Sequence, residues 1–185
     1  DLLSTKSLFT YSTFAAGVGA AYSFDNDIRL KAESRSTIDL FKQAGQSYTA
    51  LGVPSIVYAY GLFFKDEDVR ITGRLLFEAM ALSGLANISM KYIIGRARPF
   101  MEKGKGDFEF FEPSNGYQSF PSGHTTVAFT LATVLAERID TWWAYAGFYS
   151  IAALTGYERI HSDNHWFSDV VGGALLGYFC SQAVL

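Results

Sequence analysis

Residues 120–136 read FPSGHTTVAFTLATVLA, a proline–serine–glycine turn that leads directly into an apolar run. The run is rich in alanine and leucine and too long for a typical strand, so it predicts a helix over 125–136. Apolar runs of the same kind recur along the chain and predict further helices at 7–22, 48–64, 68–94, 141–157 and 166–185. The sequence therefore predicts an all-α helical bundle with about six main helices.

The composition limits the class of protein. With 185 residues the chain suits one domain, 1–185, and is short for two. Apolar residues make up 49% and aromatic residues 16%, which excludes a disordered chain. The net charge is −3 and the basic residues are scattered, so nothing favours nucleic acid as a partner. A lone cysteine, Cys180, excludes an internal disulfide and is typical of a small buried hydrophobe.

The relation to a membrane depends on the length of the apolar runs. Most of them are shorter than the roughly 20 residues that a spanning helix needs. The predicted helix at 68–94 also carries Arg74, Glu78 and Lys91. We therefore expect a soluble or surface-associated bundle, with membrane association left open. The expected location is the cell envelope, either periplasmic or membrane-associated, and the sequence says nothing of the oligomeric state.

The ends of the helices carry recognisable signals. Acidic residues, Asp66, Glu67 and Asp68, lie at the start of the helix at 68–94, and their negative charges are favourable at the positive N-terminal end of a helix. Asp140 is placed to cap the helix at 141–157, and residues 162–164 (Ser-Asp-Asn) to cap the last helix. Between the helices, residues 100–120 mix glycines, charges and aromatic residues and predict a long ordered loop. This loop is either a lid or substrate rim, or a plain surface excursion.

The first chemical cluster lies at 91–99, KYIIGRARP. Lys91 and Arg98 are seven residues apart and therefore share one helix face. Pro99 disfavours helical geometry at Arg98, so its guanidinium belongs at the helix end. A lysine and an arginine that converge in this way suit a tetrahedral anion. Taken alone, however, a basic helix end is more typical of a solvated surface.

The second cluster is the turn at 121–124, PSGH, which precedes the helix at 125–136. Such a turn offers backbone N–H groups and the positive end of a helix dipole to an anion. Ser122 adds a hydroxyl donor, Gly123 a backbone N–H, and His124 a group that can give a proton to a leaving oxygen. On its own the turn also fits a plain helix cap.

The third cluster covers 158–173, ERIHSDNHWFSDVVGG. His165 and Asp169 are four residues apart, one helical turn, so the carboxylate can hold one imidazole nitrogen protonated and leave the other as a nucleophile. Arg159 precedes them and adds a third cation. The alternative to a catalytic pair is an ordinary His–Asp pair on a helix, which the presence of Arg159 in the same stretch disfavours.

In this order, the patterns K-x6-RP, PSGH and R-x5-H-x3-D resemble the three signature motifs of the type 2 phosphatidic acid phosphatase superfamily. That superfamily includes bacterial acid phosphatases, lipid phosphate phosphatases, glucose 6-phosphatase and vanadium haloperoxidases. The resemblance covers about 91–177, the expected catalytic region, and the first ninety residues carry no signature.

The resemblance implies a phosphatase that works through a phosphohistidine, with no metal or other cofactor. His165 would attack phosphorus, Asp169 would orient it, and His124 would protonate the leaving alkoxide. The phosphate-binding residues carried over in the same way are Lys91, Arg98, Ser122, Gly123 and Arg159. Three fixed cations would supply the charge stabilisation that a magnesium ion gives elsewhere.

Two features depart from the resemblance or lie outside it. Glu158 stands where the family usually has a serine, and an acid there could weaken anion binding or move the pH optimum in either direction. His161 lies outside the motif, and we interpret it as a structural or rim residue. The alternatives to a phosphatase are a vanadium haloperoxidase, disfavoured by the short chain, and a non-catalytic anion-binding protein, disfavoured by the intact histidines. The expected substrate is a phosphorylated small molecule or a phospholipid.

Overall fold

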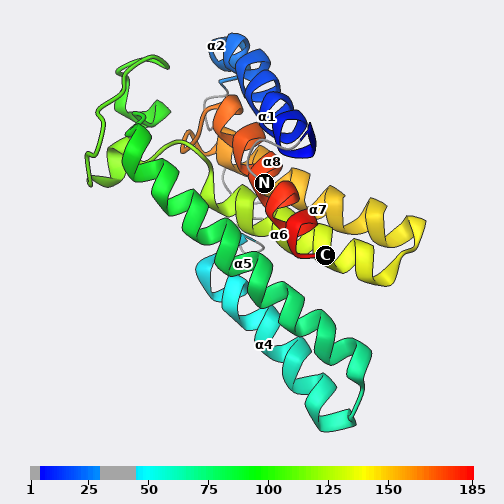
Figure 1. Cartoon of the computed structure of the whole chain (residues 1–185). Coiled ribbons are helices and arrows are strands. Elements are labelled where there is room, and N and C mark those ends of the chain that lie inside the picture. The colour runs from blue at the N-terminus through cyan, green and yellow to red at the C-terminus, as the bar shows by residue number, and fades with distance from the viewer. Residues whose placement is uncertain (1–4, 30–44) are drawn as a thin grey trace.

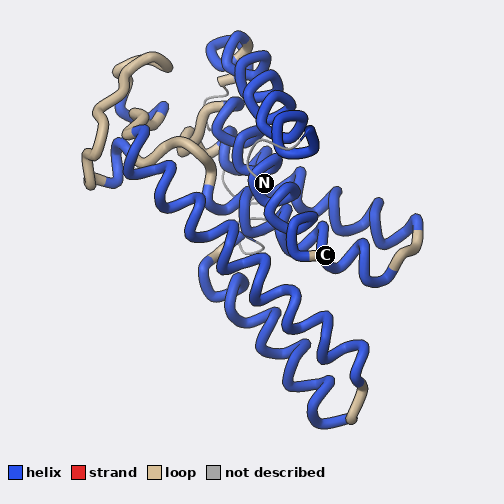
Figure 2. Tube along the Cα trace, viewed as in Figure 1, coloured by secondary structure: helices blue, strands red, loops and turns tan. Residues whose placement is uncertain are grey.

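The computed structural model describes residues 5–29 and 45–185, and these residues fold into helices joined by loops (Figures 1 and 2). The short α2 (Asp25–Ile28) is followed by two 3-10 turns, Pro99–Met101 and Asn115–Tyr117, later in the chain. The main helices are α1 (Thr5–Ser23), α4 (Ser47–Phe64), α5 (Glu67–Ile94), α6 (Gly123–Ile139), α7 (Trp142–His161) and α8 (Phe167–Val184). The prediction of an all-α fold with six main helices is confirmed, and each predicted range overlaps its helix.

The helices pack around α6. Helices α5, α7 and α8 all contact it, while α1 lies along α8 (Figure 1). Helices α4 and α5 form an antiparallel hairpin whose far end projects from the rest of the molecule (Figure 1). The buried apolar side chains between α5 and α6 include Leu76, Ala79 and Val134. The starts of α6 and α8 therefore meet near the end of α5.

Glycines on α8 bring its backbone against α6. A Cβ added at Gly173 would lie 2.5 Å from the carbonyl oxygen of Ser122, and one added at Gly177 would lie 2.6 Å from that of Thr126. Real Cβ atoms essentially never come so close to backbone, so a larger residue would separate the two helices. This contact holds the N-terminal ends of α6 and α8 side by side.

The acidic start predicted for α5 is confirmed, whereas the two predicted helix caps are wrong. The three acids lie at the N-terminal end of α5, as predicted, and the Asp66 side chain also caps the helix by accepting a hydrogen bond from the Val69 amide at 3.1 Å. Asp140 instead ends α6 in a left-handed conformation (φ 47°), and Thr141 precedes the next helix. Residues 162–164 do not cap α8, because the chain enters that helix through Trp166.

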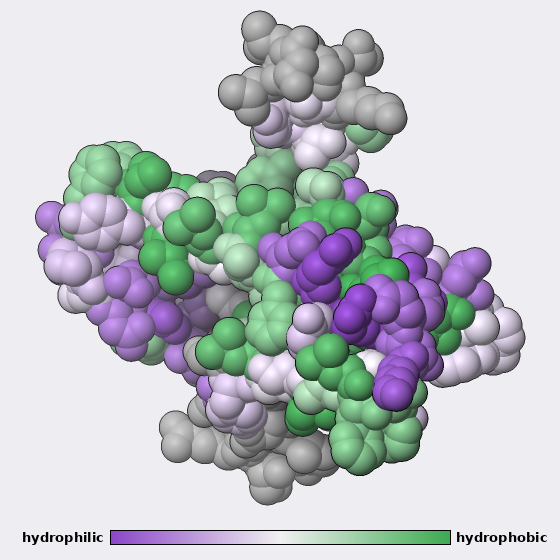
Figure 3. Space-filling view, turned by 60° about the horizontal axis from the view of Figure 1, so that its bottom comes forward, coloured by the Kyte–Doolittle hydropathy of each residue, from purple (hydrophilic) through white to green (hydrophobic). Residues whose placement is uncertain are grey.

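Many large apolar side chains lie on the surface. Phe63 on α4 is 81% exposed and Trp142 on α7 is 82% exposed. Figure 3 shows one face on which apolar residues (green) lie exposed between polar patches (purple). Within the ranges 5–29 and 45–185, no helix combines the length and hydropathy needed to cross a membrane. Cys180 is half-buried on α8, and burial raises the pKa of its thiol.

Candidate active site

The loop between α5 and α6 returns to the end of α5, and its backbone carbonyls contact the predicted site residues Lys91 and His165. Gly95 ends α5 with φ 55°, and its carbonyl oxygen accepts from the Glu109 amide at 2.6 Å. Further along, the Gln118 carbonyl accepts from the Lys91 ammonium at 2.6 Å. The Ser119 carbonyl lies 2.7 Å from Nδ1 of His165. The end of the predicted loop 100–120 is therefore part of the site wall and not a plain surface excursion.

His165 is buried, with 3% of its surface exposed, and lies just before α8. Since a carbonyl oxygen can only accept, the contact with Ser119 requires a proton on Nδ1. The other nitrogen, Nε2, then carries the lone pair. Asp169 Oδ2 is 3.7 Å from Nδ1, beyond hydrogen-bond distance, so its carboxylate acts on the ring as a nearby charge.

The surroundings keep the imidazole of His165 neutral. Burial lowers the pKa of His165 most, the positive charges of Lys91 and Arg98 also lower it, and Asp169 raises it, with a net pKa of about 3. An imidazole with this pKa is unprotonated throughout the physiological range. His165 therefore has a nucleophilic nitrogen available at acidic as well as neutral pH.

Asp169 lies in the first turn of α8 and is completely buried. Its Oδ2 accepts from the Trp166 amide at 2.9 Å and from the Ser119 hydroxyl at 2.5 Å. Burial alone would raise the pKa of Asp169, but His165, Arg96 and the Ser119 hydroxyl together hold it below its ordinary value. The carboxylate is therefore ionised and fixed in place.

The three predicted cations are linked through Arg98, which interacts with both Lys91 and Arg159, and Lys91 and Arg98 also act on His165. Burial and then the neighbouring Arg98 lower the pKa of Lys91 to about 7. The pKa of Arg98 is also lowered, by burial and by Arg159. Backbone carbonyls hold the Arg98 guanidinium, that of Asn115 at 2.9 Å and that of Asn164 at 3.3 Å. Like charges gathered in this way are stabilised by an anion placed among them.

Arg159 belongs to the last turn of α7, which runs beyond its predicted end at residue 157. Its Nε and Nη2 contact the carboxylate of Glu158, and both side chains are buried. Glu158, which replaces the usual serine, thus forms an ion pair with one of the three predicted cations. His161, in the same turn, is partly exposed, and its ring lies 6.1 Å from that of Tyr157.

The predicted turn at 121–124 leads into α6 as expected. Ser122 precedes the helix, and its amide donates to the Asp169 carbonyl at 2.9 Å. Its hydroxyl accepts from Thr125 at 2.9 Å and keeps its own proton to donate. A Cβ on Gly123 would lie 3.7 Å from Cε of Lys91, so the N-terminal end of α6 faces that lysine. The turn is thereby tied to both the first and the third cluster.

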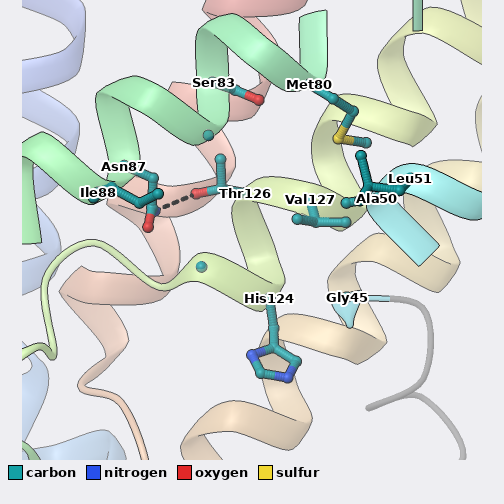
Figure 4. Close-up of a pocket in the computed structure, with 12 residues that line it drawn as sticks. Gly45, Ala50, Leu51, Met80, Ser83, Asn87, Ile88, His124, Thr126 and Val127 are labelled. Carbon is teal, nitrogen blue, oxygen red and sulfur yellow. Dashed lines mark hydrogen bonds between the residues drawn. The ribbon is translucent and has the colours of Figure 1, made fainter. Parts of the chain in front are cut away.

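His124 projects from the first turn of α6 at the edge of a cavity of about 350 Å³ (Figure 4). Its ring points away from the hydrogen bond between Asn87 and Thr126, which is 2.9 Å long. The cavity lies among α4, α5 and α6, and its apolar lining includes Leu51, Met80 and Val127. Gly123 and Asn87 also line it, so the cavity adjoins the place where Gly123 meets Lys91.

The sequence reasoning missed several residues of the site. Arg96 donates to both Asp169 and Asp25. The carbonyl of Ser119 orients His165, and that of Gln118 orients Lys91. Backbone carbonyls have no signature in a sequence. A second arginine in a basic stretch, like Arg96, looks the same as a surface cation until its burial is known. In the part of the chain that the structure describes, no three His, Cys, Asp or Glu side chains are grouped to hold a metal ion.

The fold and this arrangement of cations and histidines define a class of protein. The sequence model described as the PAP2 superfamily matches residues 72–185. The chain therefore belongs to the PAP2 superfamily, as the three motifs predict.

Known proteins resemble the chain to different extents. It is 37% identical to the lipid A 1-phosphatase of Porphyromonas gingivalis over 106 residues, 56% of this chain and 21% of that protein. The crystal structure of Aquifex aeolicus LpxE superposes with a TM-score of 0.64 and 27% identity, covering 92% of this chain and 94% of that one.

A second structure shares the fold. It is that of the transmembrane PAP2-type phosphatidylglycerolphosphate phosphatase from Bacillus subtilis, with a TM-score of 0.68, 22% identity and coverage of 96% and 92%. The chain spans less than half the length of the lipid A 1-phosphatases that it matches, between 21% and 45%.

Proposed function

We propose that this protein is a phosphatase that hydrolyses lipid phosphates or pyrophosphates through a phosphohistidine at His165, without a metal. The observation that carries the proposal is the state of His165. Its Nδ1–H is held by the Ser119 carbonyl, and burial keeps the ring neutral, so Nε2 is ready to attack. Lys91 and Arg98, which act on His165, and Arg159, which acts on Arg98, suit a phosphoryl group.

The proposed steps combine this geometry with the roles that the family resemblance implies for the other residues. Nε2 of His165 attacks phosphorus, a P–N bond forms, and the P–O bond to the leaving group breaks. His124 donates a proton to the departing oxygen and then takes one from the water that cleaves the P–N bond. Lys91, Arg98 and Arg159, with the Gly123 amide and the Ser122 hydroxyl, stabilise charge on the phosphoryl oxygens. Asp169 stabilises the positive charge that His165 acquires.

Three observations support a lipid as the leaving group. The cavity beside His124 is apolar and, at about 350 Å³, within the usual range for a small-ligand site of roughly 300–1,000 Å³. The relatives are named for lipid A and phosphatidylglycerolphosphate. Exposed apolar side chains on α4 and α7 suit contact with a lipid surface. We therefore place the protein in the cell envelope, at a membrane.

The test is a hydrolysis panel of para-nitrophenyl phosphate, phosphatidic acid, phosphatidylglycerol phosphate, undecaprenyl pyrophosphate and lipid A. We expect hydrolysis of at least one lipid substrate, undiminished by EDTA and inhibited by vanadate, which mimics phosphate. Activity lost to EDTA and restored by a divalent ion would contradict the metal-free mechanism. Bromide oxidation by peroxide in the vanadate-treated protein would favour the haloperoxidase alternative.

A cavity variant tests the lipid subsite separately. Gly84 lines the cavity, and a Cβ added there meets nothing within 4 Å. Gly84→Leu should fill the cavity and lower kcat/KM for the lipid by about 10- to 100-fold, since burial of a leucine-sized apolar group is worth about 1.5–3 kcal/mol. The loss on para-nitrophenyl phosphate should be much smaller. Gly147→Leu on α7, also in open space, is the matched control. Equal losses of kcat/KM on both substrates would contradict the proposal that this cavity binds the lipid.

A further inference from the structure

Arg96 lies at the end of α5, two residues before the predicted phosphate ligand Arg98, and is 2% exposed. All five of its N–H donors have acceptors in the described structure. Nε and Nη2 donate to the Lys105 carbonyl at 3.1 and 3.0 Å. Nη1 donates to the Ser168 hydroxyl at 2.7 Å and to Asp169 Oδ1 at 2.6 Å, and Nη2 donates to Asp25 Oδ2 at 2.7 Å. The guanidinium therefore bridges two buried carboxylates and has no donor left for a substrate.

Asp25 comes from α2, far from the site in sequence. It is 1% exposed, and its two oxygens accept from the Ser168 amide and hydroxyl, each at 2.7 Å. The family match begins at residue 72, so Asp25 lies outside it. A carboxylate from the N-terminal helices is thus bound to the first turn of α8, which also carries Asp169.

A chain of contacts runs from Arg96 to the imidazole. Arg96 holds one oxygen of Asp169, and the other oxygen accepts from the Ser119 hydroxyl at 2.5 Å. The carbonyl of the same serine accepts the Nδ1–H of His165. The Ser119 amide donates to the Arg96 carbonyl at 3.0 Å, which closes the ring. The position of the Ser119 carbonyl therefore depends on Arg96 through both the backbone and Asp169.

The charges explain why both acids are present. With one carboxylate a buried guanidinium would move toward it, whereas here Asp169 binds one terminal nitrogen and Asp25 the other, which fixes its position. Removing one partner of a buried ion pair leaves an uncompensated charge, which is costly enough to move the remaining groups. Loss of Asp25 would shift Arg96 and with it Asp169.

We propose that Asp25 and Arg96 are positioning residues of the active site, which hold Asp169 and Ser119 so that His165 keeps its proton on Nδ1 and presents Nε2 to phosphorus. The inference rests on the proposed function and assigns part of it to the N-terminal helices. Neither residue contacts the reacting atoms.

The test uses the full chain with Asp25→Asn, a substitution that keeps the shape and removes the charge. Asp27→Asn on the same helix is the matched control, because Asp27 is exposed. We expect Asp25→Asn to lower kcat on para-nitrophenyl phosphate by about 10- to 100-fold, as for other groups that orient a catalytic side chain, with KM changed less than about twofold. The control should match the unmodified protein.

The second measurement does not depend on activity. Nitrogen-15 chemical shifts of the imidazoles, assigned with His165→Asn, report which ring nitrogen carries the proton. We expect Nδ1 alone to be protonated in the unmodified protein and both tautomers to be present in Asp25→Asn. Arg96→Lys, which keeps the charge but not the planar fork, should act in the same direction and serves as the test if Asp25→Asn does not fold.

The outcomes separate the two proposals. An unchanged tautomer in the folded variants overturns the positioning role even if kcat falls, because that loss would then be merely structural. Unchanged kcat in both variants overturns it as well. If the unmodified protein hydrolyses no phosphate ester, the proposed function fails, and the tautomer measurement still decides whether Asp25 and Arg96 orient His165.

Discussion

Glu158 forms an ion pair with the neighbouring Arg159, and both side chains are buried in the last turn of α7. The carboxylate occupies part of the guanidinium that the site would otherwise offer to a phosphoryl oxygen. In the proposed role of Arg159 as a phosphate ligand, a substrate competes with Glu158 for this guanidinium. Of the two effects that the sequence leaves open for this acid, the pairing favours weaker anion binding.

Glu158→Ser should strengthen phosphate binding. A charged hydrogen bond is worth about 1.5–3 kcal/mol, so the inhibition constant of inorganic phosphate should fall about tenfold or more. The melting temperature should drop without phosphate, because Arg159 loses its buried partner, and recover when phosphate is added. Glu78→Ser, which removes an exposed acid paired with Arg74 on α5, is the control. An unchanged inhibition constant would show that Glu158 does not compete.

His165→Asn and His124→Asn should differ in their dependence on the leaving group. The nucleophile is needed for every substrate, so His165→Asn should abolish turnover on all of them. The proton donor matters less when the leaving oxygen needs no proton. His124→Asn should therefore cost about 100-fold or more on an alkyl phosphate and much less on para-nitrophenyl phosphate. Rates measured on both substrates check this, and equal losses would exclude His124 as the acid.

Lys91 should give the activity a pH dependence. Burial and Arg98 lower its pKa to about 7. Above this pH the ammonium loses its charge, so KM for para-nitrophenyl phosphate should rise with pH. Lys91→Arg keeps the charge and should remove this increase. If KM stays constant between pH 6 and about 9 in the unmodified protein, Lys91 does not titrate in this way.

The same pKa has a consequence for stability. It is lower in the folded protein than the ordinary value of 10.5, so the folded state binds fewer protons than the unfolded state between about pH 7 and 10.5. The contribution of Lys91 to the free energy of unfolding should therefore increase with pH across this window. Denaturant unfolding of the unmodified protein and of Lys91→Met, compared at pH 7 and 9, measures it. A difference between the two proteins that does not change with pH would contradict the shift.

Gly173→Ala should disturb both packing and activity. The added methyl would meet the Ser122 carbonyl at 2.5 Å and push α8 from the start of α6. We expect destabilisation of about 1–3 kcal/mol, the usual range for overpacking, together with a lower kcat. Gly147→Ala on α7 meets nothing within 4 Å and should be neutral or stabilising by up to about 1 kcal/mol. Thermal unfolding of both variants checks this, and equal melting temperatures would contradict the close contact.

Local sequence patterns predict the helices and the family. Apolar runs mark α1, α4, α5, α6, α7 and α8, because helix formation depends on nearby residues and a buried face. The motif residues Lys91, His124 and His165 stand out because their spacing and order are read directly from the chain. The caps were predicted less well. Asp140 and residues 162–164 have the right chemistry, but the turn geometry makes Thr141 and Trp166 the N-cap residues.

The tertiary structure decides how these residues are held and charged. The tautomer of His165 depends on a carbonyl at Ser119, 46 residues away, and any residue type offers the same carbonyl. The pairing of Arg96 with Asp25 joins positions 71 residues apart. Burial, which shifts the pKa values of Lys91 and His165, is a property of the packed chain. Sequence spacing thus predicts which groups are present, whereas solvent exclusion and long-range contacts decide their protonation and orientation, because both arise only when distant segments pack together.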